Sequence, residues 1–330
     1  MKEKILILGS TSFAGASFIN YCLDQGCSVL GISRSAEYDL ALRPYGRHAQ
    51  IKNFRFEQAD INSDFEKIKK LTQEFQPDFF ADYAGQGMVA QSWQNPEQWY
   101  ETNIVAKVKL HDWLKDQKYL KKFLRVSTPE VYGSTTGKIK EDTVFNPSTP
   151  YAVSHAATDM SLRTFYQHYG FPVVSTRTAN FYGPGQQLYR IVPRAILSAL
   201  TGKKLPLHGG GHSVRSFVYS QDFSHSMWLA LTKGKPGEIY HVASDEYVSI
   251  RDLVQKVCHL TDVDFNQVVE ITGDRPAKDQ AYYLDTQKAQ KELGWKNKTS
   301  LDEGLKQTVD WVKKNLNRLK ELPWDYEHKK

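Results

Sequence analysis

A glycine-rich segment runs from Gly9 to Gly15, between the apolar run Ile5–Leu8 and a stretch, Phe13–Asp24, whose apolar residues recur at helical spacing. A glycine-rich turn between a strand and a helix can hold the pyrophosphate of a dinucleotide. Glycine lets the backbone approach closely, and the helix N-terminus attracts anions. Ser12 stands where a middle glycine is usual, and a plain strand-to-helix turn is the alternative interpretation. The flanking pattern favours a cofactor site formed by Gly9, Ser12, Phe13, Ala14 and Gly15.

The end of the second predicted strand, Ser28–Ser33, bears on which dinucleotide is bound. An acidic residue there would bind the ribose 2′-hydroxyl of NAD, but Ser33 and Arg34 stand at this place. Arginine pairs well with a 2′-phosphate, whereas a solvated surface arginine is the plainer alternative. We predict NADP as the preferred cofactor and NAD as the second candidate. Further cofactor contacts are predicted at the ends of the third and fourth strands, at Asp60, Ile61, Ala84 and Gly85.

A second group of reactive side chains lies in the middle of the chain. Tyr151 and His155 are four residues apart, which places them on one face of a helix. Thr149 is a suitable N-cap for that helix, and Pro150 suits its first position. Thr128 and Glu130 follow another predicted strand, Lys122–Ser127. A tyrosine and a histidine at this spacing often serve only packing, but their position after a dinucleotide loop favours catalysis.

The elements that must position these residues alternate between short apolar strands and helices. The predicted strands are Ile5–Leu8, Ser28–Ser33, Phe54–Asp60, Asp78–Ala84, Lys122–Ser127 and Pro172–Arg177, and the predicted helices include Phe13–Asp24, Asp64–Phe75 and about Pro96–Lys115. Such alternation predicts an α/β fold, a Rossmann-type doubly wound parallel sheet. Beyond residue 178 glycine and proline become frequent, which indicates a smaller C-terminal α/β substrate lobe. We expect residues 1–178 to form the dinucleotide-binding domain, with a return segment near 217–244 that includes a strand at Glu238–Val242. Residues 179–216 and 245–330 then form the lobe.

Composition and charge exclude several classes of protein. The chain has 330 residues, of which 40% are hydrophobic and 24% charged, so extended disorder is excluded. No apolar stretch approaches the roughly 18 residues of a membrane span, and we expect no signal peptide. Three cysteines without a CxxC pair predict a reducing, cytoplasmic setting. The net charge of +6 suits an anionic small molecule as well as nucleic acid, but no block of like charges argues for nucleic acid, and we expect no nucleic-acid partner.

Several short segments, taken together, carry a family resemblance. They are Gly9–Gly15, Glu101–Ile104, Ser127–Gly133, Arg177–Pro184, Arg215–Asp222, Asp274–Pro276 and Glu292–Trp295. In order and spacing they resemble an extended short-chain dehydrogenase/reductase of the nucleotide-sugar-modifying kind, above all the 4,6-dehydratases acting on dTDP-glucose or GDP-mannose. The resemblance covers nearly the whole chain.

The resemblance implies a catalytic role for each residue of the second group. Tyr151 would take the proton of the sugar C4 hydroxyl during hydride transfer to the nicotinamide, and Thr128 would hydrogen-bond the C4 oxygen. The C4 ketone makes the C5 proton acidic, and Glu130 stands where the dehydratases keep the base that removes it. Water would leave from C6, and hydride would return there. His155 would hydrogen-bond the nicotinamide ribose.

Three positions depart from the family pattern. His155 replaces a lysine whose charge favours the tyrosine phenolate, and imidazole carries less charge at neutral pH. We expect His155 to stay neutral and to anchor the ribose only. Pro129 occupies the place of the aspartic acid of dTDP-glucose dehydratases, although GDP-mannose dehydratases also lack that acid. Gly87 and Met88 replace a serine and histidine beside the sugar, so Met88 is expected to line an altered substrate pocket.

The resemblance also implies how the lobe binds the sugar nucleotide. Arg215 and Arg275 match diphosphate-binding positions, and Asn180 would donate an amide hydrogen bond to the same group. Arg194 and Lys204 are further candidates, with solvated helix-face charges as the alternative. His208 is expected to flank the nucleotide base. No metal site is expected, because glycines separate His208 from the next histidine.

Three functions remain open at this level: a 4,6-dehydratase, a C4 epimerase or C4 oxidase of the same family, and a cofactor-binding protein without turnover. The resemblance further implies a homodimer through two helices of each chain. The apolar residues expected at that interface are Trp99, Val105, Val108, Leu110, Trp113, Ala152, Ala156, Met160 and Phe165.

Overall fold

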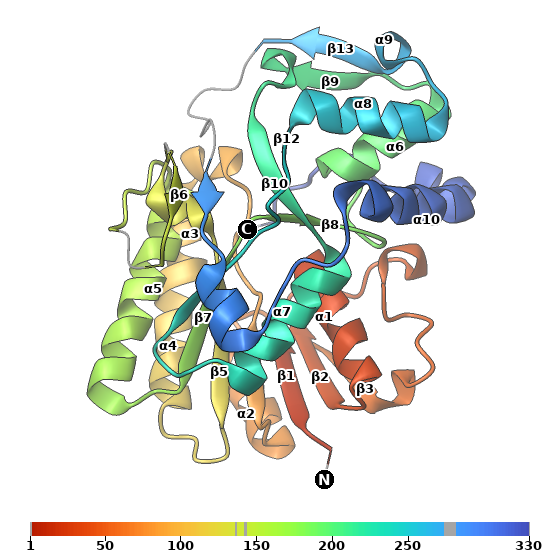
Figure 1. The fold of residues 1–330 in the computed structure, drawn as a ribbon. Coiled ribbons are helices and arrows are strands. Elements are labelled where there is room, and N and C mark those ends of the chain that lie inside the picture. Colours follow the sequence, from red (N-terminus) through yellow and green to blue (C-terminus); the bar gives the residue numbers. More distant parts are fainter. Residues whose placement is uncertain (1, 136, 142–143, 274–281, 330) are drawn as a thin grey trace.

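A seven-stranded parallel sheet forms the centre of the computed structural model, which describes residues 2–135, 137–141, 144–273 and 282–329 (Figure 1). In spatial order its strands are β11 (Ile239–Val242), β7 (Val173–Thr178), β5 (Lys122–Ser127), β4 (Phe79–Asp82), β1 (Lys4–Leu8), β2 (Ser28–Ser33) and β3 (Phe54–Gln58). The strand order reverses at β1, between β2 and β4. Open parallel sheets bind ligands at the carboxyl ends of the strands at such a point.

Helices cover both faces of this sheet because both faces are apolar. In β1 the side chains of Ile5 and Ile7 pack against α1 (Phe13–Asp24) and α7 (Ser220–Lys233), whereas those of Leu6 and Leu8 point to the opposite face. There they meet α2 (Phe65–Phe75), α4 (Ala106–Leu114) and α5 (Pro150–Tyr169). A strand buried on both faces reads as a continuous apolar run, which is why the sequence pattern predicts it.

The C-terminal lobe lies above the carboxyl ends of the sheet and has its own core (Figure 1). Its helices are α6 (Ile191–Thr201), α8 (Ile250–Thr261), α9 (Phe265–Val268) and α10 (Leu301–Glu321). Its strands are β8 (Asn180–Tyr182), β9 (Leu205–His208), β10 (Val214–Tyr219), β12 (Tyr247–Ser249) and β13 (Val269–Thr272). The pair β6 (Lys138–Ile139) and β14 (Tyr283–Leu284) links distant parts of the chain. Single 3₁₀ turns occupy Leu40–Leu42, Ile51–Asn53, Ala90–Trp93, Pro129–Tyr132 and Gly209–Gly211, and a π-helical turn occupies Ala289–Leu293.

The predicted α/β fold with a parallel sheet is confirmed, and the expected return strand is β11. Within the return segment, β10 pairs with β8 and β12 in the lobe rather than with the main sheet. The helix expected at Pro96–Lys115 is divided into α3 (Pro96–Tyr100), a π-helical turn at Glu101–Val105, and α4. Among the described residues, no helix combines the length and apolar character that crossing a membrane requires.

The residue-level expectation for the dimer interface is wrong at four positions. Trp99, Leu110, Ala152 and Ala156 are between 0 and 5% exposed, because other parts of this chain already cover them. They contribute no surface to a partner. Val105 and Met160, by contrast, are 50% and 56% exposed.

Candidate active site

The glycine-rich loop has the close backbone approach that a dinucleotide requires. Gly9 has φ +81°, and a Cβ there would lie 2.4 Å from the backbone nitrogen of Ala84. A Cβ on Gly15 would lie 2.5 Å from the carbonyl oxygen of Gly9. Ser12 is the N-cap of α1, since its hydroxyl accepts from the Gly15 N–H at 3.0 Å and donates to the Gly9 carbonyl at 2.7 Å. The first N–H groups of a helix lack intrahelical partners, so those of Phe13 and Ala14 suit a pyrophosphate.

The end of β2 contacts both this loop and the C-terminal segment. The Ser33 hydroxyl lies 2.8 Å from that of Thr11, so Ser33 helps to hold the loop. The Arg34 guanidinium donates to the carbonyl oxygen of Lys329 at 3.1 Å, and the Gln86 amide donates to the same oxygen at 2.9 Å. The C-terminal segment therefore bridges the residues that follow β2 and β4, at the edge of the sheet where this kind of fold binds the ribose of a dinucleotide. Stacking of His328 on Trp99, with ring centroids 5.2 Å apart, fixes the segment further.

The other predicted cofactor residues have different environments. Asp60 is half-buried, and its carboxylate accepts from the Asn62 N–H at 2.8 Å. Ile61 is 7% exposed and packs in the core beneath β3, which leaves it little surface for an adenine ring. Ala84 and Gly85 follow β4, directly opposite the Gly9 turn.

Asn103, within the π-helical turn, fixes the loop after β4. Its Oδ1 accepts from the Gln86 N–H at 2.9 Å, and its Nδ2 donates to the Gln86 carbonyl at 3.2 Å. The same amide donates to the Ser154 hydroxyl at 2.9 Å, next to the start of α5. π-helical turns often occur at functional sites, and here the turn directs one amide both to the loop after β4 and to α5.

Thr128, Glu130 and Tyr151 are gathered at the carboxyl end of β5. Thr128 caps the turn that follows the strand, accepting from the Glu130 N–H at 3.2 Å. Its hydroxyl proton thus remains available, and a hydrogen bond from it to Tyr151 lowers the pKa of that tyrosine. Thr149 caps α5 by accepting from the Ala152 N–H at 3.1 Å, which starts the helix just before Tyr151.

The groups around Tyr151 have opposite effects on its pKa. Burial, and then the Glu130 carboxylate, raise the pKa of Tyr151 well above its ordinary value. The Thr128 hydrogen bond and the charges of Arg190 and Arg125 lower it. A cation close to the phenol would shift this balance toward the phenolate, which is the form that accepts a proton.

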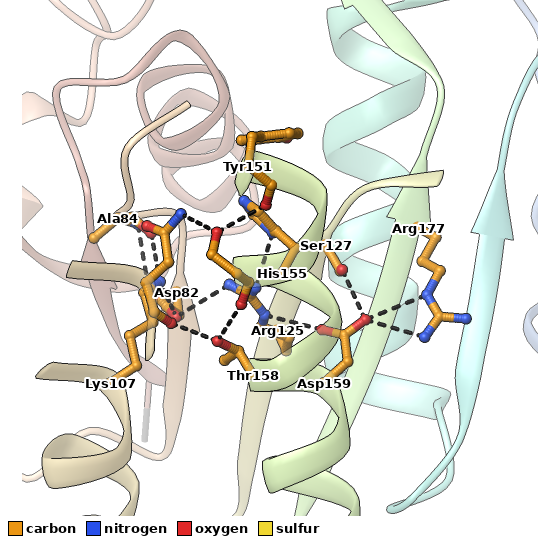
Figure 2. Close-up of polar contacts among 12 residues, drawn as sticks. Asp82, Ala84, Lys107, Arg125, Ser127, Tyr151, His155, Thr158, Asp159 and Arg177 are labelled. Atoms are coloured by element: carbon orange, nitrogen blue, oxygen red, sulfur yellow. Dashed lines mark hydrogen bonds and ion pairs between the residues drawn. The ribbon is translucent and has the colours of Figure 1, made fainter. Parts of the chain in front are cut away.

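His155 lies one helical turn after Tyr151, with the two ring centroids 4.5 Å apart. Its Nδ1 is 2.9 Å from the Arg125 guanidinium (Figure 2). Burial, and then the charges of Arg125 and Lys107, hold the pKa of His155 well below its ordinary value. These surroundings support the expectation that the imidazole is neutral at physiological pH.

A buried cluster of five charged residues lies behind His155 (Figure 2). Its members come from β4, α4, β5, α5 and β7, and are Asp82, Lys107, Arg125, Asp159 and Arg177. The Lys107 ammonium is 2.5 Å from Asp82 and also donates to the Ala84 carbonyl. Asp159 accepts from Arg177 at 3.0 Å, from Arg125 at 3.3 Å and from the Ser127 hydroxyl at 2.8 Å. A buried charge requires such partners, since an unpaired one is strongly destabilising.

The predicted substrate residues fall into two groups. Asn180 and Arg215 meet at Tyr282, whose hydroxyl donates to Asn180 at 3.3 Å and whose ring lies 5.0 Å from the Arg215 guanidinium. Arg194 donates instead to the carbonyl of Trp324 at 2.7 Å, and Lys204 donates to that of Gln267 at 2.8 Å. Both of these cations hold segments of the lobe together.

The other three predicted substrate positions are His208, Met88 and Arg275. His208 pairs with the Thr272 hydroxyl at 2.9 Å, beside the β9–β13 contact. Met88 is half-buried in the loop after β4. Arg275 lies outside the described residues.

Sequence reasoning missed the roles of Asn103 and of the charged cluster. A signal existed for the cluster, because Arg125 and Arg177 interrupt strands that are otherwise apolar or small. A charge within a strand buried on both faces needs a partner, so each pointed to a carboxylate elsewhere. The pairing with Asp159 and Asp82 required the three-dimensional arrangement.

Known proteins resemble this chain over almost its whole length. A family model described as GDP-mannose 4,6 dehydratase matches residues 6–308. A probable dTDP-glucose 4,6-dehydratase of Sinorhizobium fredii is 31% identical, over 94% of this chain and 93% of that protein. The crystal structure of a dTDP-glucose 4,6-dehydratase from Streptomyces venezuelae with bound NAD has a TM-score of 0.87 at 28% identity, covering 96% of this chain and 98% of that one. A UDP-glucose 4-epimerase from Thermotoga maritima has a TM-score of 0.86 at 27% identity, covering 95% and 99%.

Proposed function

The chain belongs to the GDP-mannose 4,6-dehydratase family of nicotinamide-dependent sugar-nucleotide enzymes, and we propose that it removes water across C5 and C6 of the hexose of a sugar nucleotide. The observation that carries this proposal is the gathering of Thr128, Glu130 and Tyr151 at the end of β5. Both groups lie close enough to Tyr151 to change its pKa, which the Thr128 hydroxyl lowers and the Glu130 carboxylate raises. A cofactor sensor without turnover would have no use for a carboxylate at this place.

The glycine-rich loop fits a bound dinucleotide, because Gly9 and Gly15 let the turn pack directly against the backbone of Ala84 and of Gly9 and so leave the first N–H groups of α1 for a pyrophosphate. A bound nicotinamide would supply hydride transfer, away from C4 and back to C6. Tyr151 takes the proton of the C4 hydroxyl, and the Thr128 hydroxyl, which donates to Tyr151 when no substrate is present, turns to donate to the C4 oxygen. Glu130 removes the C5 proton once C4 is a ketone. That proton also serves the departing C6 hydroxyl, because Pro129 carries none.

A panel of dTDP-, GDP- and UDP-hexoses, analysed by mass spectrometry after incubation with enzyme and cofactor, tests this proposal. We expect one substrate to lose the mass of one water. Loss of two hydrogens would instead indicate a C4 oxidase. A substrate of unchanged mass but altered sugar configuration would indicate an epimerase, the second candidate function, which the buried Pro129 in place of an acid favours.

We propose NADP as the preferred form of the cofactor, although the related dehydratase structure holds NAD. Ser33 adds no carboxylate to repel a 2′-phosphate, and the Arg34 guanidinium, now bonded to the Lys329 carbonyl, is placed to pair with one. Arg34→Ala is expected to weaken NADP(H) binding by about 1.5–3 kcal/mol and to leave NAD(H) binding nearly unchanged. Fluorescence titration with both cofactors measures this.

The matched control for that titration is Arg55→Ala, which removes an exposed arginine paired with Glu57 on the neighbouring strand β3. It is expected to change neither affinity. Equal affinities of the unaltered enzyme for the two cofactors, or NAD retained through purification, would refute the NADP preference.

We propose that the enzyme acts as a homodimer through α4 and α5. The support is the pair of exposed apolar side chains at Val105 and Met160, on elements that also hold the active site. Replacing both by glutamate is expected to convert the dimer to a monomer in analytical ultracentrifugation at micromolar concentration, because charge at an apolar interface must be desolvated. Val144→Glu, at an 84% exposed loop residue, should remain dimeric. A monomeric unaltered protein would contradict the proposal.

We also propose that the enzyme is located in the cytoplasm. It is supported by Cys22, Cys27 and Cys258, which are all buried free thiols and suit a reducing compartment.

A further inference from the structure

His155 stands where related enzymes are expected to have a lysine, and an arginine lies directly behind it. The Arg125 guanidinium is 2.9 Å from the Nδ1 atom of His155, and Arg125 is only 1% exposed (Figure 2). A guanidinium has donors and no acceptor, and it keeps its charge in proteins. In this contact Arg125 therefore donates and Nδ1 accepts. A neutral imidazole that accepts at Nδ1 carries its proton on Nε2.

The cluster behind His155 also carries excess positive charge. Among the described residues, Lys107, Arg125 and Arg177 contribute three positive charges, and Asp82 and Asp159 contribute two negative ones. The three Arg125 contacts are to His155, to Asp159 at 3.3 Å and to Asp82 at 3.7 Å. The formal surplus of one charge is the charge that a lysine at position 155 would have supplied.

Burial and the charges of Arg125 from β5 and Lys107 from α4 disfavour a proton on the imidazole of His155. The carboxylates of Asp82 from β4 and Asp159 from α5 pair with these two cations, and Tyr151 lies one helical turn before His155 on α5. Burial lowers the pKa of Lys107 to about 8, so near neutral pH this lysine is also charged. A proton added to His155 would be buried beside two cations, and its pKa is accordingly held low. At Tyr151 the Arg125 charge acts in the same direction as that of Arg190, against the Glu130 carboxylate.

We propose that Arg125 is a positioning residue that, together with His155, replaces the lysine. The guanidinium holds His155 as the neutral tautomer with its proton on Nε2, so that the imidazole donates a hydrogen bond to the nicotinamide ribose. The same guanidinium supplies the fixed positive charge that stabilises the Tyr151 phenolate. This inference rests on the proposed function in that it takes Tyr151 as the base for the C4 hydroxyl.

The tautomer can be measured without substrate or cofactor. Nitrogen NMR of the ¹⁵N-histidine-labelled protein resolves neutral Nδ1–H, neutral Nε2–H and histidinium forms, and a His155→Gln variant assigns the signal among the ten histidines. We expect His155 to remain the neutral Nε2–H form from about pH 6 to pH 9. A histidinium signal within this range, or an Nδ1–H tautomer, overturns the proposal. This readout stands whether the enzyme proves to be a dehydratase or an epimerase.

The effect of the Arg125 charge on Tyr151 can be measured from the pH dependence of cofactor reduction in a single turnover. Arg125→Met removes both the donor and the charge. We expect it to release the His155 tautomer and to move the rising limb of the rate by about one pH unit or more toward alkaline pH, which lowers the rate about tenfold at neutral pH. Arg125→Lys keeps a charged donor and should keep the limb close to that of the unaltered enzyme.

Arg177→Met is the matched control, because it removes a second buried arginine from the same cluster that contacts Asp159 but is not bonded to His155. It should leave the His155 tautomer unchanged. The double variant Arg125→Met with His155→Lys should recover the lost rate, since the lysine restores the charge at its family position. If Arg125→Met alters neither tautomer nor pH profile, the proposal is wrong. If it does not fold, the tautomer of the unaltered protein and the Arg125→Lys profile still decide.

Discussion

Replacing Tyr151 by phenylalanine is expected to slow hydride transfer from C4 by about 10²–10⁴-fold, the usual contribution of a positioned general base. Phenylalanine keeps the ring that lies 4.5 Å from the His155 ring, so the helix and the crevice should be unchanged. Stopped-flow absorbance of the reduced cofactor measures the loss directly. Binding of the sugar nucleotide should change little.

The pH profile of the unaltered enzyme gives this prediction a second signature. Burial and the Glu130 carboxylate raise the pKa of Tyr151, and only the phenolate accepts a proton, so the rate should rise toward alkaline pH. Tyr169→Phe removes a hydroxyl from an exposed tyrosine in the last turn of the same helix and should be silent. A Tyr151→Phe variant that reduces cofactor at the normal rate would exclude this residue as the base.

Replacing Glu130 by glutamine is expected to separate oxidation from dehydration. Without the carboxylate the C5 proton is not removed, so loss of water should slow by about 10²–10⁴-fold, while reduction of the bound cofactor continues. The Glu130 charge also raises the pKa of Tyr151, so its removal should move the rising limb of cofactor reduction to lower pH. Mass spectrometry should therefore detect a 4-keto sugar that has lost two hydrogens and no water.

Glu141→Gln is the control for this variant. Glu141 is a half-buried carboxylate that accepts from the His241 N–H at 3.0 Å, and the glutamine oxygen can accept the same bond. Its product should be that of the unaltered enzyme. If Glu130→Gln dehydrates normally, the proton at C5 is removed by another group and the assignment of Glu130 fails.

Much of the fold could be predicted because short stretches of sequence determine the strands and helices of the main sheet. The bounds of α1, β2 and β5 equal those expected, since each is a run of helical or β-type periodicity closed by a cap, a turn or a glycine. The divided helix between β4 and β5 was not predictable in this way. Thr102, Asn103 and Val105 are weak helix formers, but weak propensity does not specify a π-helical turn, and this turn serves the contacts of Asn103 with Gln86 and Ser154.

The site was predictable where a motif carries the chemistry and not where distant segments meet. The positions of Tyr151 and Thr128 could be predicted from capping residues and strand ends. Arg194 was predicted to bind substrate, but its guanidinium holds the C-terminal segment through the Trp324 carbonyl. The contacts of Lys329 with residues near the start of the chain join positions almost 300 residues apart, and no local pattern indicates them. The partners of Arg125 come from two other elements, α5 and β4, so its effect on His155 depended on the sheet order.

The central claim, dehydration by way of a C4 ketone, is tested most directly by isotope content after reaction in D₂O. The proton that Glu130 takes from C5 leaves with the water, and C5 must then take a new one from solvent. We predict a product that has lost one water and carries one carbon-bound deuterium, at C5, after its hydroxyl groups are exchanged back in H₂O. A product of unchanged mass without carbon-bound deuterium, as C4 epimerisation would give, would contradict the account.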